Sequence, residues 1–252
     1  MRKFRETGSR KNDLLEGKSS QSNILDGKGG NDVLSGGRKN DILKGGGGDD
    51  RLNGFAGADE LDGGRGDDVI RAGAGSDVIA GGKGRDELFG QGGDDRVFGG
   101  AGVDVLGGGK GDDDLTGGAG DDRVFGGAGN DDIRSGKGRD VVVGGAGSDR
   151  FIFKVSESAD GADEVVIRDF EPENDILLAF SSINRSTNSR QFDVNSLVVT
   201  EVSGGVRVQI FDDLNDNGVE ADGSFLLRGV SLEDVQDNAD QIFGPFVSAV
   251  FF

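Results

Sequence analysis

Apolar side chains recur every nine residues along much of the first 150 residues of this chain. Each of them stands two positions after an aspartate that keeps the same spacing. Glycines fill much of the stretch ahead of each aspartate, as in Gly126-Gly127-Ala128-Gly129 before Asp131. A strict short period of this kind is typical of a solenoid, in which each repeat buries its apolar face only against its neighbours.

We number the repeat so that the aspartate stands at position six and the apolar residue at position eight. The pattern predicts a turn over positions one to six and a short strand over positions seven to nine, with only the central strand residue pointing inward. Two turns and two strands then close one coil of eighteen residues. The position-six aspartates are Asp32, Asp41, Asp50, Asp59, Asp68, Asp77, Asp86, Asp95, Asp104, Asp113, Asp122, Asp131, Asp140 and Asp149.

The repeats decay towards the start of the chain. The repeat 18–26 has lost its glycines and carries Asn23 at position six, and Asp13 belongs to a further repeat that is out of phase by one residue. Residues 1–26 are therefore expected to form a basic, frayed tail and a degenerate N-terminal cap. Eighteen residues before Asp32 stands Leu14, so we expect Asp32 to lack an acidic partner on that side.

After Phe151 glycine becomes scarce and the apolar stretches resemble ordinary strands. Several alternate with period two, which is typical of half-buried strands, and Ser231 precedes a short helical pattern as a capping residue. Residues 153–252 are therefore predicted to form a β-rich cap that closes the C-terminal end of the repeats. The predicted strands are 151–153, 164–170, 175–180, 197–200, 205–211 and 224–227, and 181–195 is predicted to be a loop.

Composition and charge exclude several classes of function. The chain has no Cys and no His, so disulfides and Ser-His or Cys-His nucleophile systems are impossible. A formal net charge of −19 disfavours nucleic acid as a partner and favours a cation that offsets the repulsion. No apolar run is long enough to span a membrane, and the N-terminus lacks the apolar segment of a signal peptide.

The repeats offer oxygen ligands at regular intervals. Calcium takes six to eight oxygens, and stacking brings position-six aspartates from repeats eighteen residues apart together, such as Asp104 with Asp122. Such a site does not exist in the unfolded chain, so folding is expected to depend on calcium. The alternative is a glycine-rich roll held by Asn and Asp turn chemistry without metal.

The segment 117–153, with its repeated GGAGDD, GGAGND and GGAGSD turns, resembles the RTX (repeats-in-toxin, hemolysin-type) calcium-binding family. The resemblance covers residues 27–152 and implies an all-β fold: a right-handed parallel β-roll capped by a C-terminal β-rich domain. It also implies that the position-six aspartates and nearby turn carbonyls hold multiple calcium ions (Ca2+). Such carbonyls would belong to Gly100, Gly102, Gly118, Gly120, Gly127 and Gly129.

The region 149–177 is similar to the C-terminal part of serralysin-type proteins and of alginate-epimerase R-modules. That resemblance implies an uncleaved signal for type I secretion and an extracellular location. The apolar end, 246–252, is either part of that signal or a buried terminal strand. A separate segment, 213–222, resembles the start of an EF-hand loop without its final Glu and is either a calcium site or a plain hairpin turn, its candidate ligands being Asp213, Asn215 and Asn217.

Position-nine residues divide between two faces of the roll. Phe89, Gly107, Phe125 and Val143 line one face, which is expected to pack against residues 153–252 or, alternatively, to bind a partner. The leading functional interpretation is a secreted calcium-binding β-roll protein that is not itself an enzyme. The alternative is an accessory module of a larger RTX enzyme or toxin that binds a polysaccharide or serves secretion.

Overall fold

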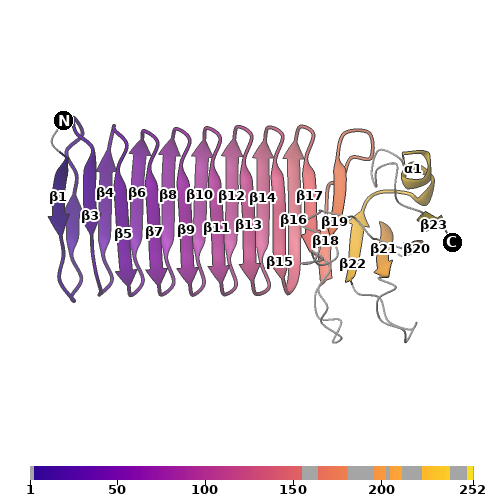
Figure 1. Cartoon of the computed structure of the whole chain (residues 1–252), viewed down its shortest axis with the longest axis horizontal. Helices are drawn as coiled ribbons and strands as arrows, with labels where there is room; N and C mark the ends of the chain where they lie inside the picture. Colours follow the sequence, from indigo (N-terminus) through magenta and orange to yellow (C-terminus); the bar gives the residue numbers. More distant parts are fainter. Residues whose placement is uncertain are drawn as a thin grey trace, which may run out of the picture.

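The chain forms a long two-sheet roll with a β-rich region at its C-terminal end (Figure 1). The computed structural model describes residues 3–154, 164–180, 196–202, 205–211, 223–238 and 249–251. In the described residues the only regular structure besides strands is a single short helix, α1, and no helix is long and apolar enough to cross a membrane. The all-β prediction is confirmed.

Alternate repeats contribute strands to opposite sheets, and every neighbouring pair of strands within the roll is parallel. We call the sheet of odd-numbered strands sheet A. Its strands, in spatial order, are β1 (Phe4–Thr7), β3 (Asn23–Asp26), β5 (Ile42–Gly47), β7 (Glu60–Arg65), β9 (Val78–Lys83), β11 (Arg96–Ala101), β13 (Asp114–Ala119), β15 (Asp132–Lys137), β17 (Arg150–Lys154) and β19 (Ile176–Phe180).

Sheet B begins with the even-numbered strands of the roll and continues into the C-terminal region. Beyond β18 the pairing includes antiparallel neighbours, β22 with β21 and β21 with β20. Its strands, in spatial order, are β2 (Leu14–Glu16), β4 (Val33–Gly37), β6 (Arg51–Ala56), β8 (Val69–Ala74), β10 (Glu87–Gly92), β12 (Val105–Lys110), β14 (Arg123–Ala128), β16 (Arg139–Ala146), β18 (Glu164–Ile167), β22 (Gly223–Arg228), β21 (Gly205–Phe211), β20 (Ser196–Val202) and β23 (Ala249–Phe251).

The strands are longer than the repeat pattern predicted. Strand β8 covers positions seven to nine of one repeat and positions one to three of the next, so the turn keeps only positions four to six. The expectation of a six-residue turn and a three-residue strand is wrong, because the glycine-rich backbone also pairs from coil to coil. Two residues of β8 rather than one point inward, Ile70 and Ala72, and both are fully buried.

The position-eight residues form a continuous apolar column between the two sheets. Each of them from Leu25 to Phe151 is at most 1% exposed. Burial of one such side chain stabilises the fold by about 1.5–3 kcal/mol relative to exposure. Because each coil adds only a few such side chains to the stability of the fold, the roll needs many stacked coils.

From Phe4 onward the N-terminal segment is folded rather than frayed. Strand β1 pairs with β3, and β2 pairs with β4 so that Leu15 lies beside Leu34 in the apolar column. The extra residue in the turn between β2 and β3 restores the register after the phase slip seen in the sequence. The decayed repeat around Asp13 is therefore a real coil of the roll.

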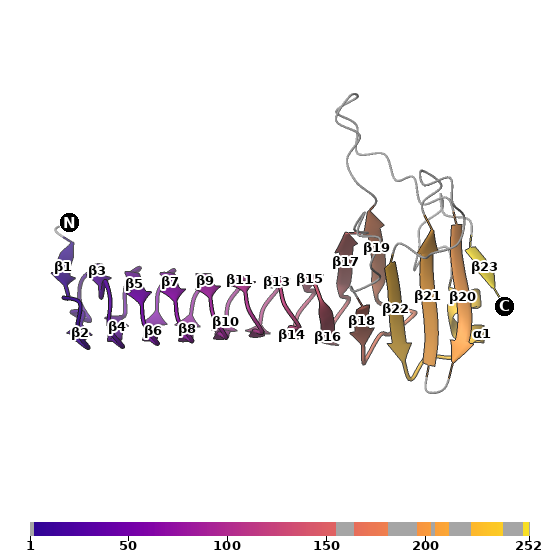
Figure 2. The same ribbon diagram turned by 90° about the horizontal axis from the view of Figure 1, so that it is seen from below.

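The C-terminal strands extend the roll instead of covering its face (Figure 2). Strand β18 adds to the edge of β16, and β19 adds to the edge of β17. Phe153, Ile167 and Leu177 join the same apolar column. The expectation that this region packs on the face carrying Phe89 and Phe125 is wrong for the described residues, and Phe125 remains 40% exposed.

Some of the remaining C-terminal predictions are confirmed, and others concern segments outside the described residues. The six predicted strands all occur, and α1 (Leu232–Asp237) begins at Ser231 with a capping box to Asp234. The predicted loop 181–195 and the EF-hand-like segment 213–222, with Asp213, Asn215 and Asn217, lie outside the described residues. Only 249–251 of the apolar end is described, as strand β23, which pairs with β20.

Candidate calcium sites

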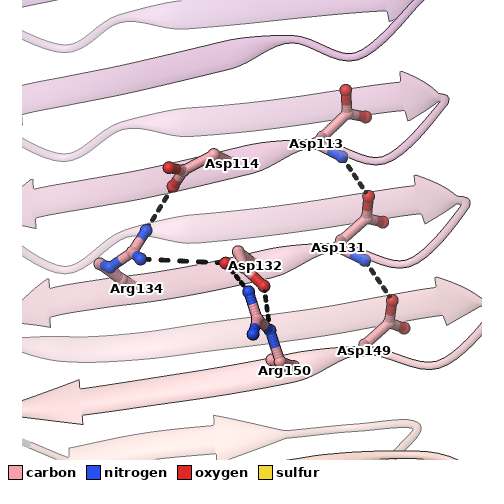
Figure 3. A network of polar contacts seen from close by, with 7 residues as sticks. All are labelled: Asp113, Asp114, Asp131, Asp132, Arg134, Asp149 and Arg150. Carbon is pink, nitrogen blue, oxygen red and sulfur yellow. Dashed lines mark hydrogen bonds and ion pairs between the residues drawn. The ribbon is translucent and has the colours of Figure 1, made fainter.

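The position-six aspartates form a buried column along each edge of the roll, which we call the inner column. The turns on one side of the roll lead into odd-numbered strands, and we call this side edge 1. The turns on the other side lead into even-numbered strands, and we call it edge 2. The backbone N–H of Asp95 donates to Oδ1 of Asp113 at 2.8 Å, and that of Asp113 donates to Oδ1 of Asp131 at 2.8 Å. Figure 3 shows this ladder continuing to Asp149. The predicted stacking of aspartates eighteen residues apart is confirmed.

Every inner-column aspartate is almost completely removed from solvent, with an exposed fraction of 0–3%. Each stands at or just before the start of a strand, and the alternation of side chains directs it between the sheets, two residues before the inward-facing position-eight residue. A charged group in this environment is costly unless it has partners. The structure therefore raises the question of what satisfies these carboxylates.

One oxygen of most inner-column carboxylates has no partner within the protein. While Oδ1 accepts the ladder hydrogen bond, Oδ2 is buried and accepts none. An unsatisfied buried acceptor costs about 1–3 kcal/mol, and more when it is charged. Among the described residues this holds for Asp32, Asp41, Asp50, Asp59, Asp68, Asp77, Asp86, Asp95, Asp104, Asp113, Asp122 and Asp131.

Where position one is glycine, the free Oδ2 and a backbone carbonyl oxygen of the next coil lie near the same point. A Cβ built on Gly36, at position one, would lie 2.5 Å from Oδ2 of Asp41 and 2.8 Å from the carbonyl oxygen of Gly54 in the next coil. At Gly81 the corresponding distances are 2.5 Å to Oδ2 of Asp86 and 2.7 Å to the Gly99 oxygen. The missing side chain thus leaves room where a carboxylate oxygen and a carbonyl oxygen converge.

Asn23 shows which other oxygens face this position. It replaces the aspartate in the first clear repeat, and its Nδ2 donates to the carbonyls of Lys18 and Gln21 at 3.3 and 3.1 Å. In the other repeats an aspartate stands at this position, and its Oδ2 is an acceptor that faces turn carbonyls, which are also acceptors. Acceptors that face one another in this way need a cation, a proton or a hydrogen-bond donor between them.

The protein itself satisfies the first carboxylate of the inner column on edge 2 and the last carboxylate of the inner column on edge 1. At the start, the backbone N–H of Ser9 donates to Oδ2 of Asp13 at 2.6 Å. At the end, Asp175 accepts from the Asp149 N–H at 3.0 Å with Oδ1 and from the Glu171 N–H at 2.8 Å with Oδ2. On edge 1 the carboxylates that lack a partner therefore lie between Asn23 and Asp175, whose side chains are both hydrogen-bonded within the protein.

Burial raises the pKa of the inner-column carboxyls, and neighbouring carboxylates raise several of them further, against the opposing effect of the ladder hydrogen bonds. The pKa rises to about 6 for Asp50, Asp77 and Asp86. The pKa rises to about 7 for Asp59, Asp68, Asp95, Asp113, Asp122 and Asp131.

This donor set fits calcium, a hard cation that binds carboxylate and carbonyl oxygens. No group of three or more acidic side chains in the described residues is arranged to hold a metal, so carbonyls have to supply much of the coordination. When bound, calcium supplies positive charge to the free Oδ2 atoms and nearby carbonyls. No redox or Lewis-acid step is implied.

The predicted carbonyl ligands have a clear structural place. The carbonyl oxygens of Gly100 and Gly102 lie against the α-carbons of Gly118 and Gly120 one coil further, and those of Gly118, Gly120, Gly127 and Gly129 are placed in the same way. These contacts explain why positions two and four favour glycine, since a side chain would collide with the carbonyl. Positive φ angles at Gly118 and Gly120 favour glycine for a second reason.

Three features of the sites were not predicted from the sequence. The partner of Asp32 is Asp13, nineteen residues away, whose N–H donates to Asp32 Oδ1 at 2.7 Å, so the expectation that Asp32 lacks an acidic partner is wrong. The carbonyls that converge with Oδ2 include those at position one. Asp175 continues the inner column although it lies outside the nine-residue period.

No curated protein sequence matches the chain. The AlgE6R3 subunit from the Azotobacter vinelandii mannuronan C5-epimerase is 24% identical, over 72% of this chain and 77% of that chain, with a TM-score of 0.27. The extracellular lipase LipA from Serratia marcescens is 19% identical, over 84% of this chain and 38% of that chain, with a TM-score of 0.29.

The family assignment rests on the repeats. The RTX calcium-binding nonapeptide repeat (4 copies) matches in overlapping segments that together run from residue 7 to residue 152, more than half of the chain. The matched segments are 7–34, 19–52, 26–59, 35–70, 53–88, 71–106, 107–142 and 125–152. The chain therefore belongs to the RTX family of calcium-binding nonapeptide-repeat proteins, and its cofactor is calcium.

Proposed function

We propose that this protein is a secreted calcium-binding β-roll whose folding is coupled to extracellular calcium, and that it is not itself an enzyme. The observation that carries the proposal is the row of buried Oδ2 atoms without a protein partner. A roll that keeps these carboxylates charged and unpaired is unstable. Calcium binding removes that penalty only in the folded state, so binding free energy becomes folding free energy.

At each proposed site the ligands are the inner-column carboxylates and carbonyls of the turns. The protein holds each carboxylate in place through the ladder hydrogen bond to Oδ1, which leaves Oδ2 available. The position-one glycine keeps the adjacent space open. Consecutive aspartates on one edge, such as Asp104 and Asp122, then contribute to neighbouring sites, and occupation of one site orders the turn of the next.

The proposed location follows from the concentration range in which such sites operate. Extracellular calcium modules bind at roughly 10⁻⁴–10⁻³ M. In that range the chain remains unfolded where calcium is scarce and folds where it is abundant. RTX proteins are typically secreted, and type I secretion through a C-terminal signal is the route that we propose for this chain.

The proposal of a non-enzymatic role rests on residue chemistry. The chain has neither His nor Cys, which removes the commonest general bases and nucleophiles. Among the described residues, the carboxyls whose pKa rises to about 6 or 7 all belong to the inner column or to Asp175, which continues it. Burial and neighbouring carboxylates in the proposed calcium sites explain these raised pKa values, so they indicate no catalytic pair.

Circular dichroism during a calcium titration tests the coupling. We expect protein in excess EDTA to lose most of its β signal and calcium to restore it cooperatively, whereas magnesium at the same concentration restores much less because it demands stricter octahedral geometry. Asp122→Asn should raise the midpoint more than Asp62→Asn, which removes one charge from the outer face of β7. A β spectrum that persists unchanged in EDTA would show that folding does not depend on calcium.

A further inference from the structure

A second column of polar side chains runs along each edge of the roll, outside the inner column. It consists of the position-five residues, which are solvent-exposed, and we call it the outer column. On edge 1 it includes Ser76, Asp94, Asp112, Asn130 and Ser148. On edge 2 it includes Asn31, Asp49, Asp67, Arg85, Val103, Asp121 and Arg139.

The outer column is a hydrogen-bonded ladder that runs in the opposite direction to the inner one. The N–H of Asp112 donates to Oδ1 of Asp94 at 3.0 Å, and the N–H of Asn130 donates to Oδ1 of Asp112 at 2.7 Å. The side chain here accepts from the following coil, whereas an inner-column carboxylate accepts from the preceding one. Each turn is therefore tied to its neighbours on both sides.

These carboxylates lie directly against the turns of the inner column. A Cβ built on Gly111 would lie 2.8 Å from Oδ1 of Asp94, and one built on Gly129 would lie 3.0 Å from Oδ1 of Asp112. Glycine at position four thus lets an outer carboxylate approach the turn of the next coil. The outer negative charge adds to the charge of the inner carboxylate that follows in sequence.

The hydrogen bonds alone do not require a charge at position five. Asn130 accepts the N–H of Ser148 at 2.9 Å, and Asn31 accepts the N–H of Asp49 at 3.1 Å. A neutral amide therefore supports the ladder as well as a carboxylate does. The charge of Asp94 and Asp112 calls for an explanation other than backbone geometry.

The charge is distributed unevenly along the two edges. Asp121 is paired with Arg139, whose Nη2 lies 2.9 Å from Oδ2, and Asp67 is followed by Arg85. No ion pair in the described residues involves Asp94 or Asp112 on edge 1, or Asp49 or Asp67 on edge 2. Asp94 and Asp112 line one groove together with Asp95 and Asp113, whose buried Oδ2 atoms lack a protein partner. Arg96 and Arg150 line the same groove, and Arg150 is paired with Asp132.

We propose that Asp94 and Asp112 make the turns of Asp95 and Asp113 fill with calcium before the turns whose position-five residue is Arg85 or Arg139. This inference rests on the proposed function and adds an order of filling to it. Calcium affinity rises with the number of negative charges at a site. Coulomb attraction over a few ångströms near a protein surface is large enough to produce about a threefold to tenfold difference in affinity even after screening.

Hydrogen exchange measured by mass spectrometry at sub-saturating calcium tests the proposal on the full chain. In the wild type, segments around 91–97 and 109–115 should gain protection at lower calcium than segments around 82–88 and 136–142. The double variant D94N/D112N should raise the calcium needed to protect 91–115 by about threefold to tenfold. It keeps the ladder because asparagine accepts the same hydrogen bond.

The matched control is D26N/D62N, which removes two charges from the outer face of sheet A. It should leave the order of protection unchanged. The N130D variant extends the charged row by one coil and should lower the calcium needed at 127–133. In 1 M KCl the difference between D94N/D112N and the wild type should shrink, which a purely structural effect would not do.

The outcomes separate this inference from the proposed function. If the wild type gains protection with calcium but D94N/D112N and the control follow the same order, the outer column does not set the filling order and the inference is wrong. If no segment of the wild type responds to calcium, the proposed coupling of folding to calcium fails first and the inference fails with it.

Discussion

The backbone N–H of Asp149 donates a hydrogen bond to Oδ1 of Asp175 at 3.0 Å, although the two residues are 26 positions apart. Steps within the regular repeats span eighteen residues. The C-terminal region therefore supplies the last carboxylate of the inner column on edge 1 and, through β19, the strand that follows β17. The region is built onto the roll through both its polar and its apolar columns.

We expect Asp175→Asn to weaken the closed C-terminal end. The asparagine keeps an acceptor for the Asp149 N–H, but its Nδ2 would oppose the Glu171 N–H that now donates to Oδ2 at 2.8 Å. Loss of this bond costs about 1–3 kcal/mol, so more calcium should be needed to order the coils next to β17. A calcium titration followed by circular dichroism measures the midpoint. Asp237→Asn, on the exposed side of α1, should leave it unchanged, and equal midpoints for the two variants would contradict the role of Asp175.

We expect Asn23→Asp to create one additional calcium site. The Asn23 amide now satisfies the carbonyls of Lys18 and Gln21, and a carboxylate there would leave acceptors facing acceptors. The variant should bind one more calcium per chain by isothermal titration calorimetry. Without calcium its N-terminal coil should lose about 1–3 kcal/mol of stability. An unchanged stoichiometry would mean that an aspartate and its turn carbonyls are not sufficient for a site.

We expect Phe55→Gly to stabilise the roll. Phe55 occupies position two with φ of 77°, a left-handed conformation in which most repeats have glycine, and its side chain is 59% exposed. Relief of this strain is worth about 1 kcal/mol after the entropy cost of glycine is included. Thermal unfolding in saturating calcium measures the change. The same substitution at Phe98, which is 41% exposed, should destabilise instead, because Phe98 has no positive φ to relieve and glycine is unfavourable within a strand.

The effect of pH should reverse sign when calcium is added. In the calcium-free roll the pKa of Asp59, Asp113 and other inner-column carboxyls is about 7, against 3.8 for the unfolded chain. The folded state therefore binds more protons between these values. The stability that those protons supply is fully present below pH 3.8 and is lost as pH rises towards 7 and above.

With calcium present, protons compete with the metal for the same carboxylates, so the calcium midpoint should rise as pH falls. Circular dichroism from pH 3.5 to 8, with EDTA and with calcium, measures both trends. A flat profile in EDTA would contradict the raised pKa values of the inner column.

The nine-residue period was sufficient to predict the roll, because an apolar residue at position eight and an aspartate at position six carry its two columns. The strands could not be bounded from the sequence, since the glycine-rich positions one to three resemble a turn and yet pair across coils, as Gly46 does with Gly64. The outer column was missed because its residues range from Asp94 through Ser76 to Val103, and no single residue type marks it.

The N-terminal register illustrates a different limit. A count of eighteen placed Leu14 beside Asp32, but the extra residue in the turn before Asn23 moves Asp13 into that place. Burial decides the register, because only this alignment puts Leu15 in the apolar column and leaves Leu14 exposed. An insertion in a turn is absorbed there without disturbing either column.

Because successive repeats alternate between the two sheets, the number of repeats, odd or even, decides which sheet the last repeat joins. Phe151 belongs to sheet A, and the C-terminal region is fitted to that assignment through β19 on sheet A and β18 on sheet B. Insertion of a single nonapeptide would place the last repeat in sheet B, so that β18 and β19 would each meet the wrong sheet. It would also move Asp175 away from edge 1, where it accepts the Asp149 N–H. Insertion of two would lengthen the roll by one coil and leave the junction intact. Repeats of this protein can therefore be gained or lost in pairs, but a single one cannot be exchanged without rebuilding the C-terminal end.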